Sequence, residues 1–383
     1  DEVVTFHKLG RDNIESIYKS AYECARTYSY GGGIGVDISS LRPRDSVVHN
    51  AADKSTGAVS FMELYSLTTG LIGQSGRRGA LMLTIDIKHP DSPLFINVKN
   101  NSNWVTSQIA KQFKWSGSFS ESQLKLAEQY VRENTQVRFA NISIKVSDEF
   151  MQAVDEEKKH NGKLLIYRKK KEISSKGISQ VGSIHYSYGM PSKPIESYEL
   201  LGAFDTLEGV NAFLKENRAD PVEETDFNDE QKRDMFGDFL IETQGEYEFA
   251  LKKAGDFMLY FASPQTGEIK RLVEARDIWN SFIEGNYKTA EPGLLFWSSM
   301  IKYSPSNYVG RPITSTNPCG EINLEDGGAC NLASINLSRF VIEGYTNNAR
   351  IDWEGIKENT STLTRFLDSV VTWNETLNPL EKQ

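Results

Sequence analysis

Three reactive side chains alternate with two helix-breaking residues in the stretch Asn317-Pro318-Cys319-Gly320-Glu321. Proline and glycine disfavour a helix, so an extended loop is expected here. Alternate side chains of an extended chain point the same way, so the amide of Asn317, the thiol of Cys319 and the carboxylate of Glu321 would share one space. A thiol between an amide and an acid–base group suits one-electron or nucleophilic chemistry on a polar substrate. The alternative interpretation is a polar surface loop with an incidental cysteine.

A second cysteine, Cys330, follows within residues 329–337, whose sequence is ACNLASINL. Together with NPCGE, this stretch resembles the active-site finger loop and the following strand of ribonucleotide reductase catalytic subunits. The Pro-Cys-Gly form and the nearby second cysteine are more similar to the adenosylcobalamin-dependent class II enzymes than to class I. The resemblance lapses over residues 155–248, which are polar and charge-rich.

The resemblance implies a role for each reactive side chain. Cys319 matches the cysteine whose thiyl radical takes the 3′-hydrogen of a ribonucleotide. Glu321 matches the base at the 3′-hydroxyl, and Asn317 matches an amide that hydrogen-bonds to the reacting ribose. Cys330 matches one half of the dithiol that supplies two electrons and becomes a disulfide. A carboxylate beside the sugar suits the removal of the 3′-proton as water leaves.

Glycines are concentrated in residues 31–35, between a predicted helix and a predicted strand. Glycines permit either a tight turn or the close approach of the backbone to a ligand. By the resemblance, Gly32 and Gly33 contact the substrate nucleotide, and Pro318 and Gly320 of the finger loop also belong to the substrate site.

Five residues resemble positions that bind a nucleoside triphosphate effector in the family: Asp12, Arg42, Gln74, Arg77 and Arg78. Asp12 matches an aspartate at the effector ribose, and Arg42 matches an arginine at the effector phosphate. A helix cap and a solvated charge are the respective alternatives. The other three lie in the basic stretch 73–80, which resembles the specificity loop that links effector identity to base choice. A solvated turn is the alternative there.

Hydrophobic periodicity predicts the elements that position these residues. Helices are expected from residue 12 to about 30, over 60–70, 147–154 and 275–284, and from about 359; strands are expected over 36–38, 81–87, 139–146 and 291–297, with a hairpin over 257–269. Cys24 lies on the apolar stripe of the first helix, so it is predicted to be a core residue.

The expected fold class is α/β. The resemblance implies the first half of the ten-stranded reductase α/β barrel with a central finger loop, plus an inserted subdomain. The expected domains are residues 1–154, with the first barrel strands and specificity loops; 155–248, an inserted subdomain of unknown role; and 249–383, with the hairpin, a barrel strand, the finger loop and the following strand and helix.

Composition excludes several other functions. The chain has 383 residues and a net charge of −9, which argues against a nucleic-acid groove. It has no run of about 18 apolar residues, so no membrane span is expected. Its three cysteines fit a reducing compartment, which favours the cytoplasm. Its five histidines occur in no ligand spacing, so no metal site is expected.

Two departures from the family pattern matter. Counting back from Asp12, the second redox cysteine of the family falls on Thr5, which cannot form a disulfide. Either this register is wrong and the cysteine precedes Asp1, or Cys330 lacks its usual partner. The second barrel half is also not found after the finger loop. The resemblance therefore implies a catalytic chain or fragment that needs a complementary C-terminal chain or segment for activity.

The expected partners are a ribonucleotide substrate, adenosylcobalamin, an effector (a deoxynucleoside triphosphate or ATP), a thioredoxin- or glutaredoxin-type reductant, and a second copy of the chain or a complementary reductase chain. One alternative is a class I large subunit driven by a separate metal-containing radical subunit. Another is a nucleotide-binding regulatory module that has lost reduction. A cysteine hydrolase using Cys319 is a third, but no histidine lies nearby in sequence.

Overall fold

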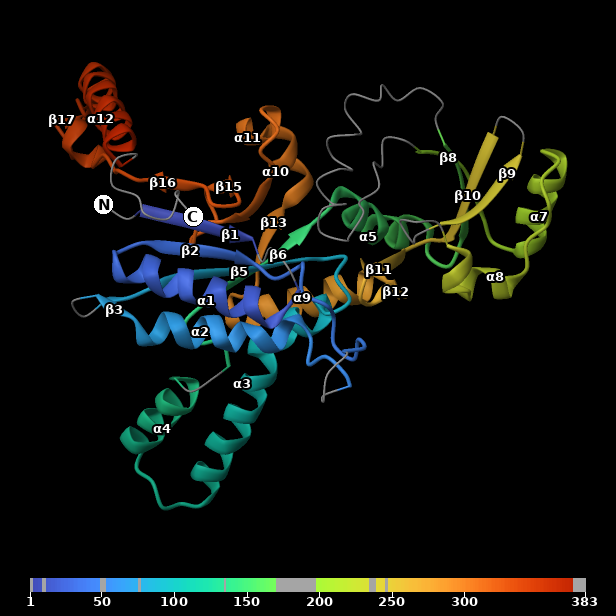
Figure 1. The fold of residues 1–383 in the computed structure, drawn as a ribbon, viewed down its shortest axis with the longest axis horizontal. Helices are drawn as coiled ribbons and strands as arrows, with labels where there is room; N and C mark the ends of the chain where they lie inside the picture. Colours follow the sequence, from blue (N-terminus) through green and yellow to red (C-terminus); the bar gives the residue numbers. More distant parts are fainter. Residues whose placement is uncertain are drawn as a thin grey trace.

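The computed structural model describes residues 3–8, 12–48, 53–74, 77–133, 136–169, 198–233, 239–244 and 247–374. Its central feature is a six-stranded sheet in the order β13-β6-β5-β2-β1-β16 (Figure 1). The first five strands of this order run parallel, and β16 pairs antiparallel with β1. The bounds are β1 Val3–Lys8, β2 Gly33–Asp37, β5 Ala80–Asp86, β6 Asn141–Val146, β13 Gly293–Phe296 and β16 Ala329–Asn331.

The two faces of the parallel strands have different compositions. On β2, β5 and β6, one set of alternate residues is aliphatic and belongs to the main core: Ile34, Val36, Leu81, Leu83, Ile85, Ile142, Ile144 and Val146. Apart from Met82, the intervening residues are mostly glycine or polar: Gly33, Gly35, Asp37, Thr84, Asp86, Asn141, Ser143 and Lys145. Because side chains alternate across a strand, the sheet has one apolar face and one largely polar face.

Helices cover the apolar face. The main core joins the strands to α1 (Ile14–Ser29), α2 (Met62–Leu71), α3 (Ser92–Trp115), α5 (Asp148–His160) and α9 (Ala275–Thr289). Figure 1 draws α1, α2 and α9 on the same side of the sheet. Parallel strands need such crossover helices, and the helices bury the aliphatic face of the sheet.

Helix α1 confirms the predicted first helix and the predicted place of Cys24. The side chain of Asn13 caps the helix by accepting a hydrogen bond from the backbone N–H of Ser16 at 2.8 Å. Cys24 is fully buried, and burial raises the pKa of its thiol far above the usual value. Since the thiolate is the reactive form, Cys24 is an inert core residue.

A second, antiparallel sheet lies at one end of the molecule, in the order β8-β7-β10-β9 (Figure 1). Its elements are β7 Leu164–Lys169, β8 Tyr198–Phe204, α7 Leu207–Glu216, α8 Glu224–Asn228, η3 Glu230–Lys232, β9 Leu240–Gln244 and β10 Tyr247–Lys253. It has its own apolar clusters. A buried ion pair between Lys252 of β10 and Glu156 of α5, 2.9 Å apart, ties it to the main core.

The remaining elements include the hairpin of β11 (Asp256–Ser263) and β12 (Gly267–Glu274), whose Phe257 and Leu259 belong to the main core. The others are η1 Ala58–Phe61, β3 Gly73–Gln74, β4 Arg77–Arg78, α4 Glu121–Glu133, α10 Trp297–Tyr303, α11 Pro305–Tyr308, β14 Ile313–Thr316, β15 Asn323–Glu325, η4 Leu337–Phe340, β17 Val341–Ile342, β18 Arg350–Ile351 and α12 Trp353–Asn374. No helix in the described part of the chain combines the length and apolar composition that a bilayer crossing needs.

The predicted α/β class is confirmed, whereas some predicted elements are not. The described strands form an open sheet rather than a closed barrel. The strand expected at 36–38 lies at Gly33–Asp37, and the last helix begins at Trp353 rather than near residue 359. The helix expected over 60–70 begins at Met62, and the hydroxyl of Ser60, in the preceding turn, donates to the carbonyl of Gly57.

Candidate active site

A hairpin of β14 and β15 lies across the polar face of the main sheet. The Ser315 hydroxyl of β14 is 3.2 Å from the Thr84 hydroxyl of β5. At the other end of the hairpin, Asn141 of β6 donates a hydrogen bond to the carbonyl of Pro318 at 2.8 Å. Both contacts use residues of the polar face, so the hairpin covers the side of the sheet that the helices leave open.

The segment that joins β14 to β15 is a tight turn, so the predicted extended loop is wrong. The N–H of Gly320 donates to the backbone carbonyl of Asn317 at 3.0 Å. The side-chain oxygen of Asn317 accepts from the N–H of Gly320 at 3.0 Å and from that of Ile322 at 3.1 Å. Asn317 is only 2% exposed, so its amide oxygen holds the turn closed. The predicted alternation of side chains i, i+2 and i+4 does not apply to this geometry.

Two glycines allow the turn to sit directly on the sheet. A Cβ atom on Gly33 would lie 2.9 Å from Cγ of Pro318, so any other residue at 33 would push the turn away. Gly320 has a φ of +88°, which favours glycine. The structure thus brings together three predicted substrate residues, Gly33, Pro318 and Gly320. The fourth, Gly32, precedes β2, where its N–H bonds to the carbonyl of Thr27 at 3.0 Å.

Cys319 and Glu321 are both exposed on this turn, and Cys330 is partly buried on β16. Burial raises the pKa of the Cys330 thiol, and the negative charge of Glu321 raises it further. The carboxylate of Glu321 is therefore close enough to Cys330 to act on its ionisation. The acid on the turn therefore influences the second thiol, which lies on β16.

The strand register shows which residue lies opposite Cys330. Cys330 pairs with Val4 of β1, whereas Thr5, the position obtained by counting along the sequence, pairs with Ala329. Position 4 is therefore the cross-strand partner of Cys330 in the backbone register, and neither residue 4 nor residue 5 is a cysteine.

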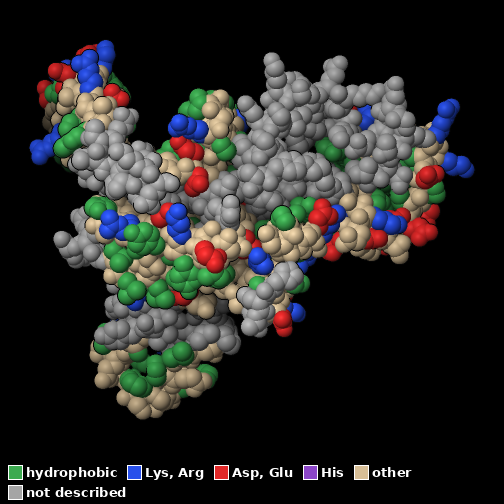
Figure 2. Space-filling model, viewed as in Figure 1, with side chains coloured by type: hydrophobic (Ala, Val, Ile, Leu, Met, Phe, Trp, Pro, Cys, Tyr) green, Lys and Arg blue, Asp and Glu red, His purple; other side chains and the backbone are tan. Residues whose placement is uncertain are grey.

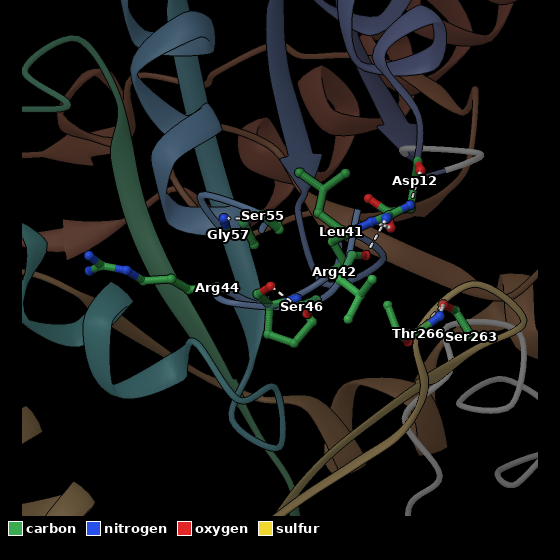
Figure 3. Close-up of polar contacts among 12 residues, drawn as sticks. Asp12, Leu41, Arg42, Arg44, Ser46, Ser55, Gly57, Ser263 and Thr266 are labelled. Atoms are coloured by element: carbon green, nitrogen blue, oxygen red, sulfur yellow. Dashed lines mark hydrogen bonds and ion pairs between the residues drawn. The ribbon is translucent and has the colours of Figure 1, made fainter. Parts of the chain in front are cut away.

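The predicted effector residues Asp12 and Arg42 bond to each other (Figure 3). The Arg42 guanidinium donates to the Asp12 carboxylate, to its backbone carbonyl at 3.1 Å, and to the carbonyl of Val47 at 3.2 Å. In this arrangement the guanidinium ties the chain entering α1 to the loop that follows β2.

The other three predicted effector residues lie at the opposite end of α1. Gln74 belongs to β3, and Arg77 and Arg78 belong to β4, in a small hairpin whose side chains are outside the described structure. The next residue, Gly79, packs on the ring of Tyr28, near the C-terminal end of α1. A 16-residue helix is roughly 24 Å long, so a single copy of the chain does not bring the two groups together.

Sequence reasoning missed the polar residues beneath the hairpin, namely Asp37, Thr84, Asn141 and Lys145. The signal was present in the alternation of polar and aliphatic residues along β2, β5 and β6. Across the described ranges, no three His, Cys, Asp or Glu side chains gather in a group that could hold a metal ion.

The fold and site define an α/β domain that presents an exposed cysteine on a hairpin across a parallel sheet. The family model described as "Ribonucleotide reductase, barrel domain" matches residues 3–179 and 224–383, so the chain belongs to this family. The match extends into both ends of the stretch 155–248, over which the resemblance was expected to lapse, and leaves residues 180–223 unmatched.

Curated relatives carry related names. The chain is 27% identical to a vitamin B12-dependent ribonucleoside-diphosphate reductase of Thermoplasma acidophilum, over 95% of the chain and 30% of that protein. It is 22% identical to a protein of the same name from Mycobacterium tuberculosis, over 94% of the chain and 32% of that protein. It is also 22% identical to the ribonucleoside-diphosphate reductase large subunit of Vaccinia virus, over 95% of the chain and 34% of that protein. The chain spans about a third of the length of these relatives.

A disulfide test separates the two candidate partner positions. We expect Val4→Cys to form a disulfide with Cys330 on mild oxidation, because directly paired residues lie about 4.5–5.5 Å apart, within disulfide range. Thr5→Cys is the matched control and should stay reduced, because position 5 pairs with residue 329. Non-reducing peptide mass spectrometry reads out both variants. A disulfide in Thr5→Cys, with none in Val4→Cys, would show that the register is wrong.

The charge of Glu321 should control the reactivity of Cys330. Glu321→Gln removes a negative charge that raises the pKa of the Cys330 thiol, so the pKa should fall and the thiolate fraction at pH 8 should rise. We expect iodoacetamide to alkylate Cys330 about twofold faster in the variant than in wild type. The difference should vanish at high pH, where Cys330 is ionised in both proteins. Glu325→Gln, on the next strand, is the control and should leave the rate unchanged. An unaltered Cys330 pH profile in Glu321→Gln would contradict the assignment.

Proposed function

We propose that the chain is part of a ribonucleotide reductase that reduces ribonucleoside di- or triphosphates to deoxyribonucleotides through a thiyl radical on Cys319. The observation that carries the proposal is the exposed thiol at the apex of a hairpin held on a parallel sheet. Glu321 on the same turn and Cys330 on the adjoining strand support it, since the reaction needs a base and a second thiol near the first.

The proposed chemistry divides among three side chains. The Cys319 sulfur radical forms an S–H bond as the C3′–H bond of the ribose breaks, and it returns the hydrogen at the end. Glu321 takes the 3′-hydroxyl proton while the 2′-hydroxyl leaves as water. Two electrons come from thiols, one of which is Cys330. Asn317 closes the turn through its oxygen, and we propose that its amide also faces the ribose.

The source of the second thiol follows from the register. Because Val4 lies across from Cys330, we propose that a thioredoxin- or glutaredoxin-type reductant supplies the other thiol directly. Two thiols then become one mixed disulfide, releasing the two electrons and two protons that the reduction consumes. Such a reductant implies a reducing compartment, for which we propose the cytoplasm.

Adenosylcobalamin is the proposed radical source, since several relatives are named vitamin B12-dependent. When bound, this cofactor supplies an organic radical. The feature of the chain that fits it is the exposure of the Cys319 thiol, which a radical formed outside the hairpin can reach. The large-subunit names among the relatives keep a class I enzyme with a separate radical-generating metal subunit as the second candidate.

The relatives are about three times as long as the chain, so we assign the activity to the chain together with a complementary segment. We propose that the five parallel strands are one half of a ten-stranded barrel and that the β14–β15 hairpin is its finger loop. We also propose that residues 155–248 form an inserted subdomain.

Nucleotide binding and turnover should separate in Cys319→Ser. We expect this variant to bind ribonucleotide within about twofold of wild type, because the hydroxyl is nearly isosteric, yet to lose all reduction, because an alcohol does not form the radical. Equilibrium binding and product analysis with adenosylcobalamin, a thiol reductant and the complementary segment provide the measurements. Hydrogen exchange into adenosylcobalamin distinguishes class II from class I. Binding without turnover in wild type would instead favour a regulatory module.

A homodimer would reunite the predicted effector residues. Apolar and aromatic side chains are exposed along α1 and α2: Ile14, Tyr18, Tyr22, Leu67 and Leu71 (Figure 2). In a two-fold pair with antiparallel α1 helices, the Asp12–Arg42 end of one copy meets the β3–β4 end of the other. We propose this arrangement as the site for an effector, either ATP or a deoxynucleoside triphosphate.

Disrupting this face should abolish both dimerisation and effector binding. Tyr22 is 62% exposed in the middle of α1, so Tyr22→Glu should give monomers by sedimentation and weaken effector binding by about tenfold or more. Tyr287→Glu, at an even more exposed tyrosine on α9, is the control and should change neither property. A monomeric Tyr22→Glu protein that binds effector as tightly as wild type would exclude a site shared between copies.

A further inference from the structure

A buried ion pair lies beneath the hairpin, at the ends of two sheet strands. The Nζ atom of Lys145 on β6 lies 2.9 Å from a carboxylate oxygen of Asp37 on β2, and the two side chains are only 3% and 1% exposed. The same Asp37 oxygen accepts hydrogen bonds from the hydroxyls of Ser39 at 2.7 Å and Thr84 at 3.2 Å. If either side chain moved out of the pair, the other charge would stay buried without a counter-charge, which is strongly unfavourable. Both side chains are therefore held in this position.

The network reaches the hairpin at two adjacent residues of β14. Lys145 Nζ lies 3.4 Å from the backbone carbonyl of Thr314. The Thr84 hydroxyl, which donates to Asp37, lies 3.2 Å from the hydroxyl of Ser315, which is positioned to donate to it. Lys145 also lies over the ring of Trp297, 4.7 Å from its centroid, at the start of α10. One fixed ammonium group therefore connects β2, β6, β14 and α10.

The network and the turn anchor the hairpin at separate points. The first anchor is at Thr314 and Ser315; the second is where Pro318 meets Gly33 and Asn141. A single anchor would leave the hairpin free to pivot, whereas two anchors fix its orientation. Cys319 follows the second anchor by one residue, so its direction depends on both.

We propose that Asp37, Lys145 and Thr84 are positioning residues that set the orientation of the β14–β15 hairpin and hence of the Cys319 thiol. They touch no substrate in this role and act through β14. The inference rests on the proposed function only in naming Cys319 as the reacting group, because the geometry of the hairpin is independent of that chemistry.

The test compares two neutralised ion pairs. Asp37→Asn/Lys145→Met removes both charges of the network while keeping the side-chain volumes and an oxygen acceptor for Ser39 and Thr84. The matched control, Lys88→Met/Glu149→Gln, removes another buried pair, 2.7 Å apart and 4% and 6% exposed, that links the end of β5 to α5. The readout is the iodoacetamide alkylation rate of Cys319 by peptide mass spectrometry, with glutathione added to the same reaction as the reference thiol.

We expect Cys319 to react about fivefold faster in the network variant, because the released hairpin samples more open orientations, and to change less than twofold in the control. Lys145→Arg, which keeps the charge, should retain the wild-type rate. If the network variant does not fold, Thr84→Val tests the proposal instead, because valine has the shape of threonine but lacks its hydroxyl. This variant should raise the Cys319 alkylation rate about twofold.

A folded network variant whose Cys319 reacts at the wild-type rate would overturn the proposal. An equal change of the Cys319 rate in the control variant would also overturn it. If Thr84→Val is the one variant that folds, an unchanged Cys319 rate in Thr84→Val would overturn it. Alkylation needs no turnover. A wild-type protein that is inactive with the complementary segment but shows the expected alkylation pattern would therefore count against the proposed function alone. An active protein whose network variant shows unchanged alkylation would count against the positioning network alone.

Discussion

Burial of both faces of the parallel strands is the constraint on which the rest of the structure depends. All five residues of β2 are buried, as are six of the seven residues of β5. Helices remove one face from water, and the β14–β15 hairpin lies across the other. Polar groups on the hairpin side then depend on partners within the protein, since an unpaired buried group costs about 1–3 kcal/mol. Asn141, Lys145 and Ser315 have such partners, whereas Oδ2 of Asp37 and the hydroxyl of Thr314 have no hydrogen bond in the described structure. The polar face and the hairpin therefore require each other.

The same constraint explains why the reactive thiol is exposed at the apex. The oxygen of Asn317 satisfies two backbone donors of the turn, and Pro318 packs against Gly33, so both side chains are committed to holding the loop. Cys319 lies between Pro318 and the left-handed Gly320, where the chain turns away from the sheet. The residues around the cysteine are thus structural as well as chemical, which accounts for the combination of residue types in this short stretch.

The sequence predicted elements with strong periodicity and failed where three-dimensional contacts decide the conformation. Helix α1, the buried strand β5 and the β11–β12 hairpin were predicted from their patterns, as was the core position of Cys24. The long helices α3 and α4 were missed; α3 contains the polar run Lys99–Asn103, and its propensity signal is weak. No local pattern reports strand register, so the pairing of Cys330 with Val4 could not be predicted from the sequence.

The candidate site, like the fold, was predicted from the sequence only in part. The types of Asn317, Cys319 and Glu321 indicated a reactive loop, but the turn that arranges them depends on hydrogen bonds that no spacing rule predicts. Asp37 and Lys145 are 108 positions apart by their numbering, and only the parallel pairing of β2, β5 and β6 brings them together. An isolated lysine in a strand sequence carries no sign of its distant partner.

Strand β13 ends the main sheet on one side. It pairs with β6, and none of the described strands pairs with its outer edge. A parallel strand left in this way presents a row of peptide N–H and C=O groups that can template the addition of a further strand. The exposed side chain of Phe296 adds apolar surface at the C-terminal end of β13. Handled alone at high concentration, the chain would therefore be prone to edge-to-edge aggregation, and covering this border would matter as much for its solubility as for completing its architecture.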